Sequence, residues 1–411
     1  MKIGIISDLH LGKRNYGIIE LENDFYTQYH KNIQELIKNK VNTVIIAGDI
    51  FDTPKPSALA ISQFQEGIRQ LNKNNINVLN IIGNHTMLQT PHHIPADELF
   101  TNEFDYQLLN ENNKYIQDDI AIVGLPYHNN NKLPELKEKI HKLAKEIKNY
   151  RLKILVLHQE FQEYCGFAGA KLSIHDIPVQ EFDIIICGHI HERKSTLIDG
   201  TKTFYIQPGS IERLNSSEAL NEFYNGKGIT IIDTRKNLDI LSRERIINIP
   251  PERKYLIREY AFTKENNGKD IIPTFDTLKR KLQSLDLKPV VFLTIEDETN
   301  SYNLITEQVD RINDDSLMTK FTYYDLNSQD TLYLKDYQDK ELPSAREALK
   351  EAIKSDGFDE SVIDLYDAAV SPDDDLQKAA DDLFKKLYPP VEVEPFCDPE
   401  LDEIVAYFEE K

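Results

Sequence analysis

The sequence predicts an α/β protein in which helices cover the faces of the sheets. From the first residue to about residue 250, short β-branched runs alternate with amphipathic segments of helical length. The runs are nearly continuous in apolar residues, which is typical of strands buried on both faces. Regular alternation of such strands with helices is typical of α/β folds. A shorter strand–helix alternation and then a helical tail follow after residue 250.

The strand-like runs of the first part are β-branched and apolar, and they lie at 2–7, 43–47, 77–82, 120–125, 153–157, 182–187, 203–207 and 228–233. Between them, the stretch 133–150 shows helical spacing of apolar residues. Its predicted buried face consists of Leu133, Leu136, Ile140, Leu143 and Ile147.

Two further parts are predicted beyond a linker at 251–256. Residues 255–335 form a small βαβαβ unit, with strand-like segments at 256–262, 289–295 and 321–326 and helix-like segments at 274–285 and 303–312. Residues 340–411 read as acidic helices. Their last apolar stripe needs burial somewhere, and it comprises Leu401, Ile404, Val405 and Phe408.

Composition describes an ordinary globular chain, with 40% hydrophobic and 28% charged residues. Three widely spaced cysteines argue for a reducing compartment, hence a cytoplasmic location, and against a disulfide framework. Met1 leads directly into a strand-like run, unlike a secretory signal. The longest apolar runs have strand length, so no membrane span is expected.

The formal net charge is −21 over 411 residues. The segment 341–411 holds 21 acidic and 7 basic residues, which is most of this excess. A protein that binds nucleic acid through its bulk charge is basic, so this class is excluded. If the substrate is DNA, metals and local loops must attract it.

Five of the predicted strands end in side chains that can bind metals. Ligands of α/β folds bind beyond the carboxyl ends of strands, and glycines precede three of these groups, as expected where the backbone must approach a site. The residues are Asp8 and His10 after 2–7, Asp49 after 43–47, Asn84 and His85 after 77–82, His158 after 153–157, and His189 and His191 after 182–187.

Each of these signals is weak alone, because a lone His or an Asp two residues before a His is common without any metal. The pair in GHIH is stronger, since alternation places His189 and His191 on the same side of an extended segment. Burying the whole set without a cation would be costly. The sequence therefore predicts a metal site.

The donor types narrow the metal. Imidazoles, carboxylates and a carboxamide without thiolates suit Mn²⁺, Fe or Zn²⁺ better than Ca²⁺. Seven protein ligands are too many for one ion and suit two. Two divalent ions can clamp a phosphate and activate water for in-line attack, so the predicted reaction is phosphoester hydrolysis.

The motifs DLH, GD, GNH, a lone His and GHIH, in this order, resemble the calcineurin-like metallophosphoesterases. Finer features are similar to the SbcD-type nuclease subunits of double-strand-break repair complexes: SDLHLGKRNYG, AGDIFDTPKPS, LHQEF, CGHIHER and YIQPGSIERLN. The resemblance covers residues 1 to about 250. It implies a sandwich of two mixed sheets flanked by helices, a capping domain at 255–335, two Mn²⁺ ions and DNA as substrate.

The resemblance also implies a role for each polar residue. Asp8, His10 and His191 would hold one ion, Asn84, His158 and His189 the other, and Asp49 would bridge them. His85 would be catalytic, facing the scissile phosphate rather than binding metal. Two positions depart from the family pattern: Thr86 stands where an acid usually orients this His, and Asp52 stands where many relatives have a second His.

The implied activity is a DNA exonuclease, with endonuclease cleavage as a second mode, that works with an SbcC-like ABC-type coiled-coil ATPase docked on residues 340–411. Two alternatives remain open: a two-metal enzyme for small phosphoesters, and a catalytically weak scaffold subunit that Thr86→Asp would reactivate. Loop cations are candidate DNA contacts or merely solvated charges, and these are Lys13, Arg14, Lys55, Arg193 and Arg213.

A homodimer is also implied by the resemblance. The segment 57–71 carries more apolar surface than one sheet face requires. Either part of this surface meets a second copy, or all of it packs on the parent sheet. The residues concerned are Leu59, Ile61, Phe64, Ile68 and Leu71.

Overall fold

The computed structural model describes residues 1–87, 94–165, 170–219, 226–234, 244–266 and 268–327. The predicted helical tail at 340–411, including Leu401, Ile404, Val405 and Phe408, lies outside these residues, so its structure and its docking role stay predictions. Residues Met1–Asp325 form one compact unit. The predicted boundary between a nuclease domain at 1–250 and a capping domain at 255–335 also stays a prediction.

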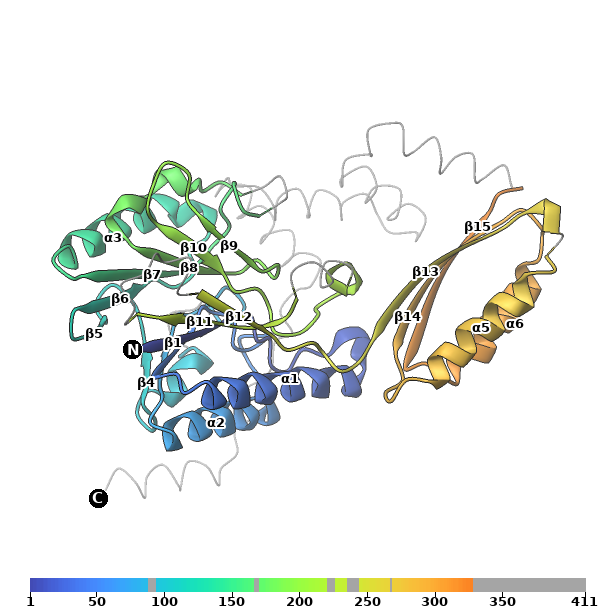
Figure 1. Ribbon diagram of the computed structural model, residues 1–411, viewed down its shortest axis with the longest axis horizontal. Helices are drawn as coiled ribbons and strands as arrows, with labels where there is room; N and C mark the ends of the chain where they lie inside the picture. The colour runs from blue at the N-terminus through green and yellow to red at the C-terminus, as the bar shows by residue number, and fades with distance from the viewer. Residues whose placement is uncertain (88–93, 166–169, 220–225, 235–243, 267, 328–411) are drawn as a thin grey trace, which may run out of the picture. The chain divides into compact units, whose positions relative to one another are not determined.

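Two six-stranded mixed sheets form the centre of the compact unit (Figure 1). In the first sheet β1, β2, β3 and β4 are parallel, β11 runs antiparallel beside β1, and β12 runs antiparallel beside β11. Its strand order is β12 (Glu244–Asn248), β11 (Gly228–Asp233), β1 (Lys2–Ile6), β2 (Thr43–Ile46), β3 (Asn77–Asn80) and β4 (Tyr106–Leu108).

The second sheet also has parallel strands in its middle, and both of its edge strands run antiparallel to their neighbours. Its order is β5 (Tyr115–Gln117), β6 (Ile120–Gly124), β7 (Leu152–His158), β8 (Ile184–Gly188), β10 (Phe204–Gln207) and β9 (Lys194–Leu197). The eight strands predicted for this part all occur, each within two residues of the predicted bounds.

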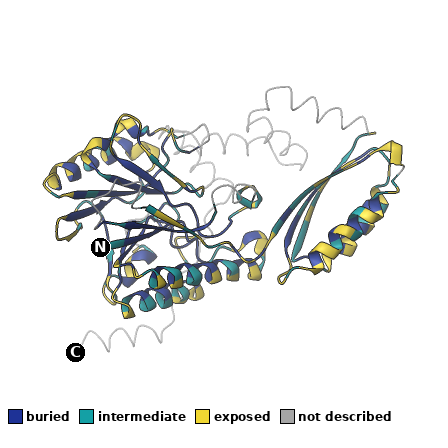
Figure 2. Cartoon of the chain, in the orientation of Figure 1, coloured by how far each residue is buried: buried dark blue, intermediate teal, exposed yellow. Residues whose placement is uncertain are grey.

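Helices α1 (Ile19–Lys38) and α2 (Ala58–Lys73) cover the outer face of the first sheet, and α3 (Leu133–Glu146) covers that of the second (Figure 1). Between the sheets lies an apolar cluster to which Ile5 of β1 and Ile154 of β7 belong. Central strands are thus buried on both faces (Figure 2), as their continuous apolar runs predict. The predicted sandwich of two mixed sheets flanked by helices is confirmed.

Apolar spacing also placed the helix faces correctly. The five predicted positions of the stretch 133–150 are buried. On α2, Phe64, Ile68 and Leu71 are buried and Ile61 packs against the same core, whereas Leu59 is 49% exposed. Most of this surface therefore packs on the parent sheet, and the homodimer stays a proposal.

A third sheet of three parallel strands follows: β13 (Tyr255–Phe262), β14 (Val290–Asp297) and β15 (Met318–Asp325). Helices α5 (Ile271–Gln283) and α6 (Tyr302–Asn313) share an apolar core with these strands, which makes the predicted βαβαβ unit. Short 3₁₀ turns lie at Asn15–Gly17, Ala96–Phe100, Asn130–Lys132, Ile174–Asp176, Val179–Glu181 and Lys264–Asn266.

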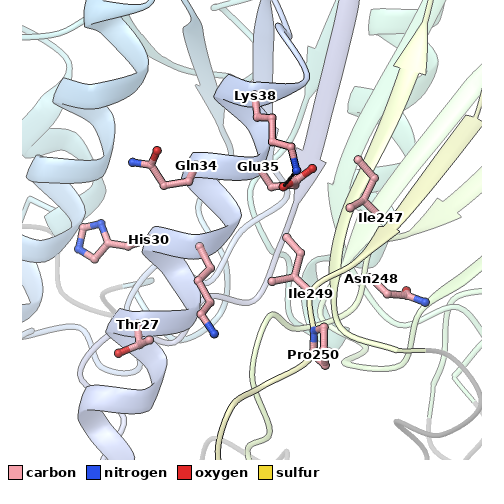
Figure 3. A pocket seen from close by; sticks show the side chains of 10 residues that line it. Thr27, His30, Gln34, Glu35, Lys38, Ile247, Asn248, Ile249 and Pro250 are labelled. Carbon is pink, nitrogen blue, oxygen red and sulfur yellow. Dashed lines mark hydrogen bonds and ion pairs between the residues drawn. The ribbon is translucent and has the colours of Figure 1, made fainter.

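A groove lies between α1 and β12 (Figure 3). His30, Lys31 and Lys38 line it from the helix, and Ile247, Ile249 and Pro250 line it from the other side. None of the predicted metal ligands is among its lining residues. Within the described part of the chain, no helix has both the length and the apolar character that crossing a membrane requires.

Candidate metal centre

The predicted ligands come together where parallel strands of the two sheets end. Strands β1, β2 and β3 of one sheet and β7 and β8 of the other lead directly into them. Asp8, His10 and His191 each place a ligand atom within 4.8 Å of the others, and so do Asp49, His158 and His189. Asn84 joins the second group, because its Oδ1 lies 3.0 Å from His158 Nε2 and 2.9 Å from His189 Nδ1.

The backbone at this edge is strained. Four of its residues have positive φ angles, in the left-handed region that residues other than glycine rarely adopt. The angles are 52° for Asp8, 44° for His10, 51° for Asp49 and 88° for His189. Main-chain hydrogen bonds between the loop after β1 and the loop after β2 hold the first three of these residues in this conformation. One of these bonds runs from Leu9 N–H to Asp49 O at 2.8 Å. Such strain persists only where surrounding contacts enforce it, and it concentrates at functional sites.

Two glycines let the loops approach one another. A Cβ on Gly83 would lie 2.1 Å from Asp49 Oδ1, and one on Gly188 would lie 2.1 Å from Ala47 O. Both distances are far shorter than any van der Waals contact. These are the glycines of GNH and GHIH, and the site requires them because the loop backbones themselves form its walls.

The imidazoles of His10 and His191 face each other through Nε2 atoms 3.3 Å apart. The Nδ1 atom of His191 lies 2.9 Å from Glu218 Oε1, and that of His10 lies 3.2 Å from Asp52 Oδ1. A nitrogen beside a carboxylate carries the hydrogen, so both Nε2 atoms turn lone pairs toward each other. Burial lowers the pKa of His10, which favours this neutral form.

The second group shows the same arrangement. His158 Nδ1 donates to Ala47 O at 2.7 Å, and His189 Nε2 donates to Glu160 Oε1 at 3.0 Å. The remaining nitrogen of each ring faces oxygen acceptors, namely Asn84 Oδ1 and, for His158, Asp49 Oδ2 at 3.1 Å. Each ring thus has one nitrogen held by an outer acceptor and the other turned toward the shared centre, which is the arrangement of histidines that ligate a metal.

The electrostatics of the site fit a cation at its centre. Although burial opposes ionisation of Asp49, the neighbouring imidazoles, His158 first, hold the pKa of this carboxyl well below its usual range. Burial likewise lowers the pKa of His158, but the Asp49 carboxylate outweighs it and raises that pKa to about 9. The carboxylate and carboxamide oxygens lie so close together that a positive charge among them is strongly favoured. The ligand types, imidazole, carboxylate and carboxamide, and their burial both suit divalent ions.

His85 belongs to neither of the groups that contain Asp8 or Asp49, but one of its ring nitrogens lies within 4.8 Å of ligand atoms of His10 and Asp52. Its main-chain N–H donates to Asp49 Oδ1 at 3.0 Å, and its Nδ1 donates to Asp52 O at 2.8 Å. The side chain is 35% exposed. The ring is therefore oriented by a main-chain oxygen, and its Nε2 is left for other contacts.

Thr86 has no part in aiming His85. It is fully buried, and its hydroxyl lies beside the carboxyl of Asp97, which is also fully buried. Asp97 Oδ1 accepts a hydrogen bond of 2.9 Å from Asn80 Nδ2. The residue after His85 thus packs beneath the loop instead of supporting the imidazole.

Three carboxylates that support the histidines were not predicted as site residues. Each lies next to the outer ring nitrogen of one histidine: Asp52 next to that of His10, Glu160 next to that of His189, and Glu218 next to that of His191. Burial would raise the pKa of Glu218, but its bond to His191 and the charge of Lys227 bring it down to about 2. The motif LHQEF contains Glu160, two residues after His158, and this was the available signal.

The structure separates the predicted DNA contacts into two kinds. Arg193 and Arg213 are buried, at 5% and 3% exposure. Arg193 donates to Pro208 O and Asn248 Oδ1, and Arg213 donates to Arg253 O. Their guanidinium groups bond to the protein's own loops, and a contact of these two arginines with DNA stays a prediction.

The other three predicted DNA contacts lie nearer the surface. Lys13 is paired with Asp52 at 3.1 Å, and Arg14 is paired with Glu22 at 2.6 Å. Lys55 is exposed. Side chains at these positions can still reach a phosphate, so their role as DNA contacts stays a prediction.

Comparison with known proteins agrees with the geometry. A family profile described as Calcineurin-like phosphoesterase matches residues 1–193. The chain is 29% identical to the DNA double-strand break repair protein Mre11 of Methanococcus maripaludis over 388 residues, which span 93% of this chain and 99% of that protein. It is 30% identical to Mre11 of Saccharolobus solfataricus over 346 residues, 82% of this chain and 85% of that protein.

Among solved structures, a dimetal phosphatase from Danio rerio overlaps with a TM-score of 0.39 at 11% identity, covering 56% of this chain and 92% of that chain. The matches to the two sequence relatives cover 93% and 82% of this chain. This chain belongs to the Mre11 family of calcineurin-like phosphoesterases.

Proposed function

We propose that this chain is a two-metal, Mn²⁺-dependent nuclease that hydrolyses phosphodiester bonds at DNA ends. Membership of the Mre11 family supports a repair nuclease, and the phosphoesterase fold implies divalent metals. The observation that carries the proposal is the inward convergence of lone pairs. His10 Nε2 and His191 Nε2 face each other at 3.3 Å while both outer nitrogens lie next to carboxylates.

In this proposal Asp8, His10 and His191 hold one ion, and Asn84, His158 and His189 hold the other. Asp49 bridges them, in keeping with distances from its Oδ2 of 3.1 Å to His158 Nε2 and 3.9 Å to His10 Nε2. Asn84 is neutral, so it adds a ligand without cancelling charge that the phosphate needs. Two ions so held supply Lewis acidity to the phosphate and lower the pKa of the attacking water.

His85 acts on the phosphate from outside the ligand set. Its Nδ1 hydrogen is committed to Asp52 O, so Nε2 donates a proton only when the ring is cationic. A cationic His85 would stabilise charge on the scissile phosphate and protonate the leaving oxygen.

The test compares linear duplex DNA with covalently closed circles at fixed Mn²⁺. We expect degradation from the ends of the linear DNA and loss of it in Asp49→Ala, because the bridging carboxylate is gone. Asp286→Ala is the matched control, since this aspartate is exposed on the βαβαβ unit. Nuclease activity that survives Asp49→Ala would refute the assignment.

A chromogenic phosphodiester separates the nuclease from an enzyme of small substrates. The acidic charge of the chain favours a small substrate slightly, whereas the additional βαβαβ unit favours DNA. If duplex DNA is cleaved much less efficiently than the small diester, the result would favour an enzyme of small phosphoesters.

We further propose that the acidic segment at 340–411 docks an SbcC-like ABC-type coiled-coil ATPase, and that the nuclease works as a homodimer. Near-complete coverage of Mre11 relatives supports a family-like assembly. Deletion of residues 340–411 should remove ATPase binding while the thermal unfolding of the remainder stays cooperative. Retained ATPase binding would contradict the docking proposal.

A further inference from the structure

Lys227 is a buried lysine outside the predicted ligand set, with 4% of its surface exposed. A buried ammonium is tolerated only when its hydrogens are fully engaged. Its Nζ lies 2.6 Å from Ser210 Oγ, 3.0 Å from Glu218 Oε2 and 3.4 Å from His191 O. All three partners belong to the wall behind the His191 ring, so the lysine is directed at this one histidine.

Glu218 connects the lysine to the ring. One oxygen, Oε1, accepts from His191 Nδ1 at 2.9 Å. The other, Oε2, accepts from Lys227 and lies 3.3 Å from both Ser210 Oγ and Leu214 N. With both oxygens fixed, the carboxylate cannot rotate without breaking several bonds, and the imidazole it holds keeps one orientation.

The other two supporting carboxylates are held less firmly. Glu160, behind His189, is 28% exposed, and Asp52, behind His10, is paired with Lys13, which is itself 23% exposed. Solvent screens such contacts, whereas the side chains of Lys227 and Glu218 are only 5% and 12% exposed. Among the described residues, His191 therefore has the most rigid support of the three.

We propose that Lys227 is a positioning residue for the ion held by Asp8, His10 and His191. It fixes Glu218, Glu218 fixes the His191 ring, and the ring's Nε2 is thereby aimed at the shared centre. His191 does not belong to the group formed by Asp49, His158 and His189, so the second ion does not depend on this support. The inference rests on the two-ion function proposed above.

Mn²⁺ titration of the full-length chain, followed by electron paramagnetic resonance of the free ion, measures each affinity without any substrate. The parent should bind two ions. In Lys227→Met one of them should weaken about 10- to 100-fold, the usual effect of losing such a supporting partner, while the other keeps its affinity. Glu218→Gln should give the same selective loss.

Two further variants separate positioning from general damage. Lys227→Arg keeps the charge and should restore much of the lost affinity, whereas Lys142→Met, at an exposed lysine of α3, should change neither ion. The double variant Lys227→Met/Glu218→Gln should bind no more weakly than either single variant, because both changes break the same connection.

The outcomes distinguish the two proposals. A parent that binds only one ion overturns the two-ion function. If the parent binds two ions and both Lys227→Met and Glu218→Gln keep the parental affinities, the proposed role of Lys227 is overturned. Equal weakening of both ions in these variants also overturns it. If Lys227→Met does not unfold cooperatively, the role of Lys227 is judged from two other variants. These are Glu218→Gln and the double variant, which leaves no unpaired buried charge, and the criterion is again the selective weakening of one ion.

Discussion

The Nδ1 atom of His85 lies 2.8 Å from the main-chain oxygen of Asp52, and this contact orients the imidazole without help from the residue that follows it. A main-chain oxygen cannot be removed by substitution of a side chain. The orientation of His85 is therefore independent of the identity of residue 86, although it depends on the loop after β2.

Replacing His85 by Gln should separate catalysis from metal binding. Because His85 belongs to neither proposed ligand set, the variant should keep two Mn²⁺ ions with parental affinity. Its kcat on linear DNA should fall about 10²- to 10⁴-fold, the usual contribution of a general acid. Mn²⁺ titration and single-turnover cleavage check both results, and loss of one ion would show that His85 is a ligand.

Thr86→Asp should destabilise the protein rather than activate it. The Thr86 hydroxyl lies beside the buried Asp97 carboxyl, so a second carboxylate there would be desolvated next to a like charge. We expect a loss of about 1–3 kcal/mol in the free energy of unfolding, measured by urea denaturation. Adding Asp97→Asn should recover most of it, and a gain of nuclease activity in Thr86→Asp alone would favour the weak-scaffold reading.

Asp97 should make stability depend on pH. Burial raises the pKa of its carboxyl from 3.8 to about 6, despite opposing contacts with Thr86 and Asn80. Below pH 4 the group is protonated in both the folded and the unfolded chain. Between the two pKa values the unfolded chain ionises while the folded carboxyl keeps its proton, so stability falls across this window by about 3 kcal/mol in all and levels off above about pH 6.

Asp97→Asn removes this titration. The advantage of the variant over the parent should grow between about pH 4 and pH 6 and then stay constant up to pH 8, since an amide never ionises in this range. Urea denaturation at these pH values measures the difference. A constant difference between parent and variant from pH 4 to pH 8 would show that Asp97 titrates normally.

The sequence was sufficient for the sandwich because its signals are local. Buried parallel strands appear as uninterrupted β-branched runs, and each ends at the edge where ligands gather, so Asp49 or His158 could be placed without a structure. Elements with weaker signals were missed. Strand β9 has only four residues, none of them buried, and it exists because it pairs with β10.

The supporting residues were harder to predict because their partners are distant in sequence. Glu218 stands 27 residues after His191, and Asn248, which accepts from Arg193, stands 55 residues after that arginine. In the sequence, an arginine in a loop next to GHIH cannot be distinguished from a cationic residue that contacts DNA. Only the pairing of β12 with β11, which brings Asn248 to this loop, shows that Arg193 is enclosed.

Gly83→Ala tests whether close approach of the loops builds the ion site. The added Cβ would meet Asp49 Oδ1 at 2.1 Å and Asp49 N at 2.5 Å, so either the Asp49 carboxylate or the turn that carries Asn84 must move. Both movements separate proposed ligands of the second proposed ion, and an error of 1 Å in a ligand is enough to weaken a site. We expect weaker Mn²⁺ binding and loss of nuclease activity with a modest change in thermal stability.

Gly200→Ala provides the matched control for this substitution. Gly200 has a φ of 72° and no atom within 4 Å of an added Cβ, so alanine there brings backbone strain of about 1 kcal/mol without a collision. This control should lose stability and keep both ions, whereas Gly83→Ala should lose ion affinity beyond any loss of stability. Equal Mn²⁺ affinities in the two variants would mean that the approach of Gly83 to Asp49 is not what shapes the centre.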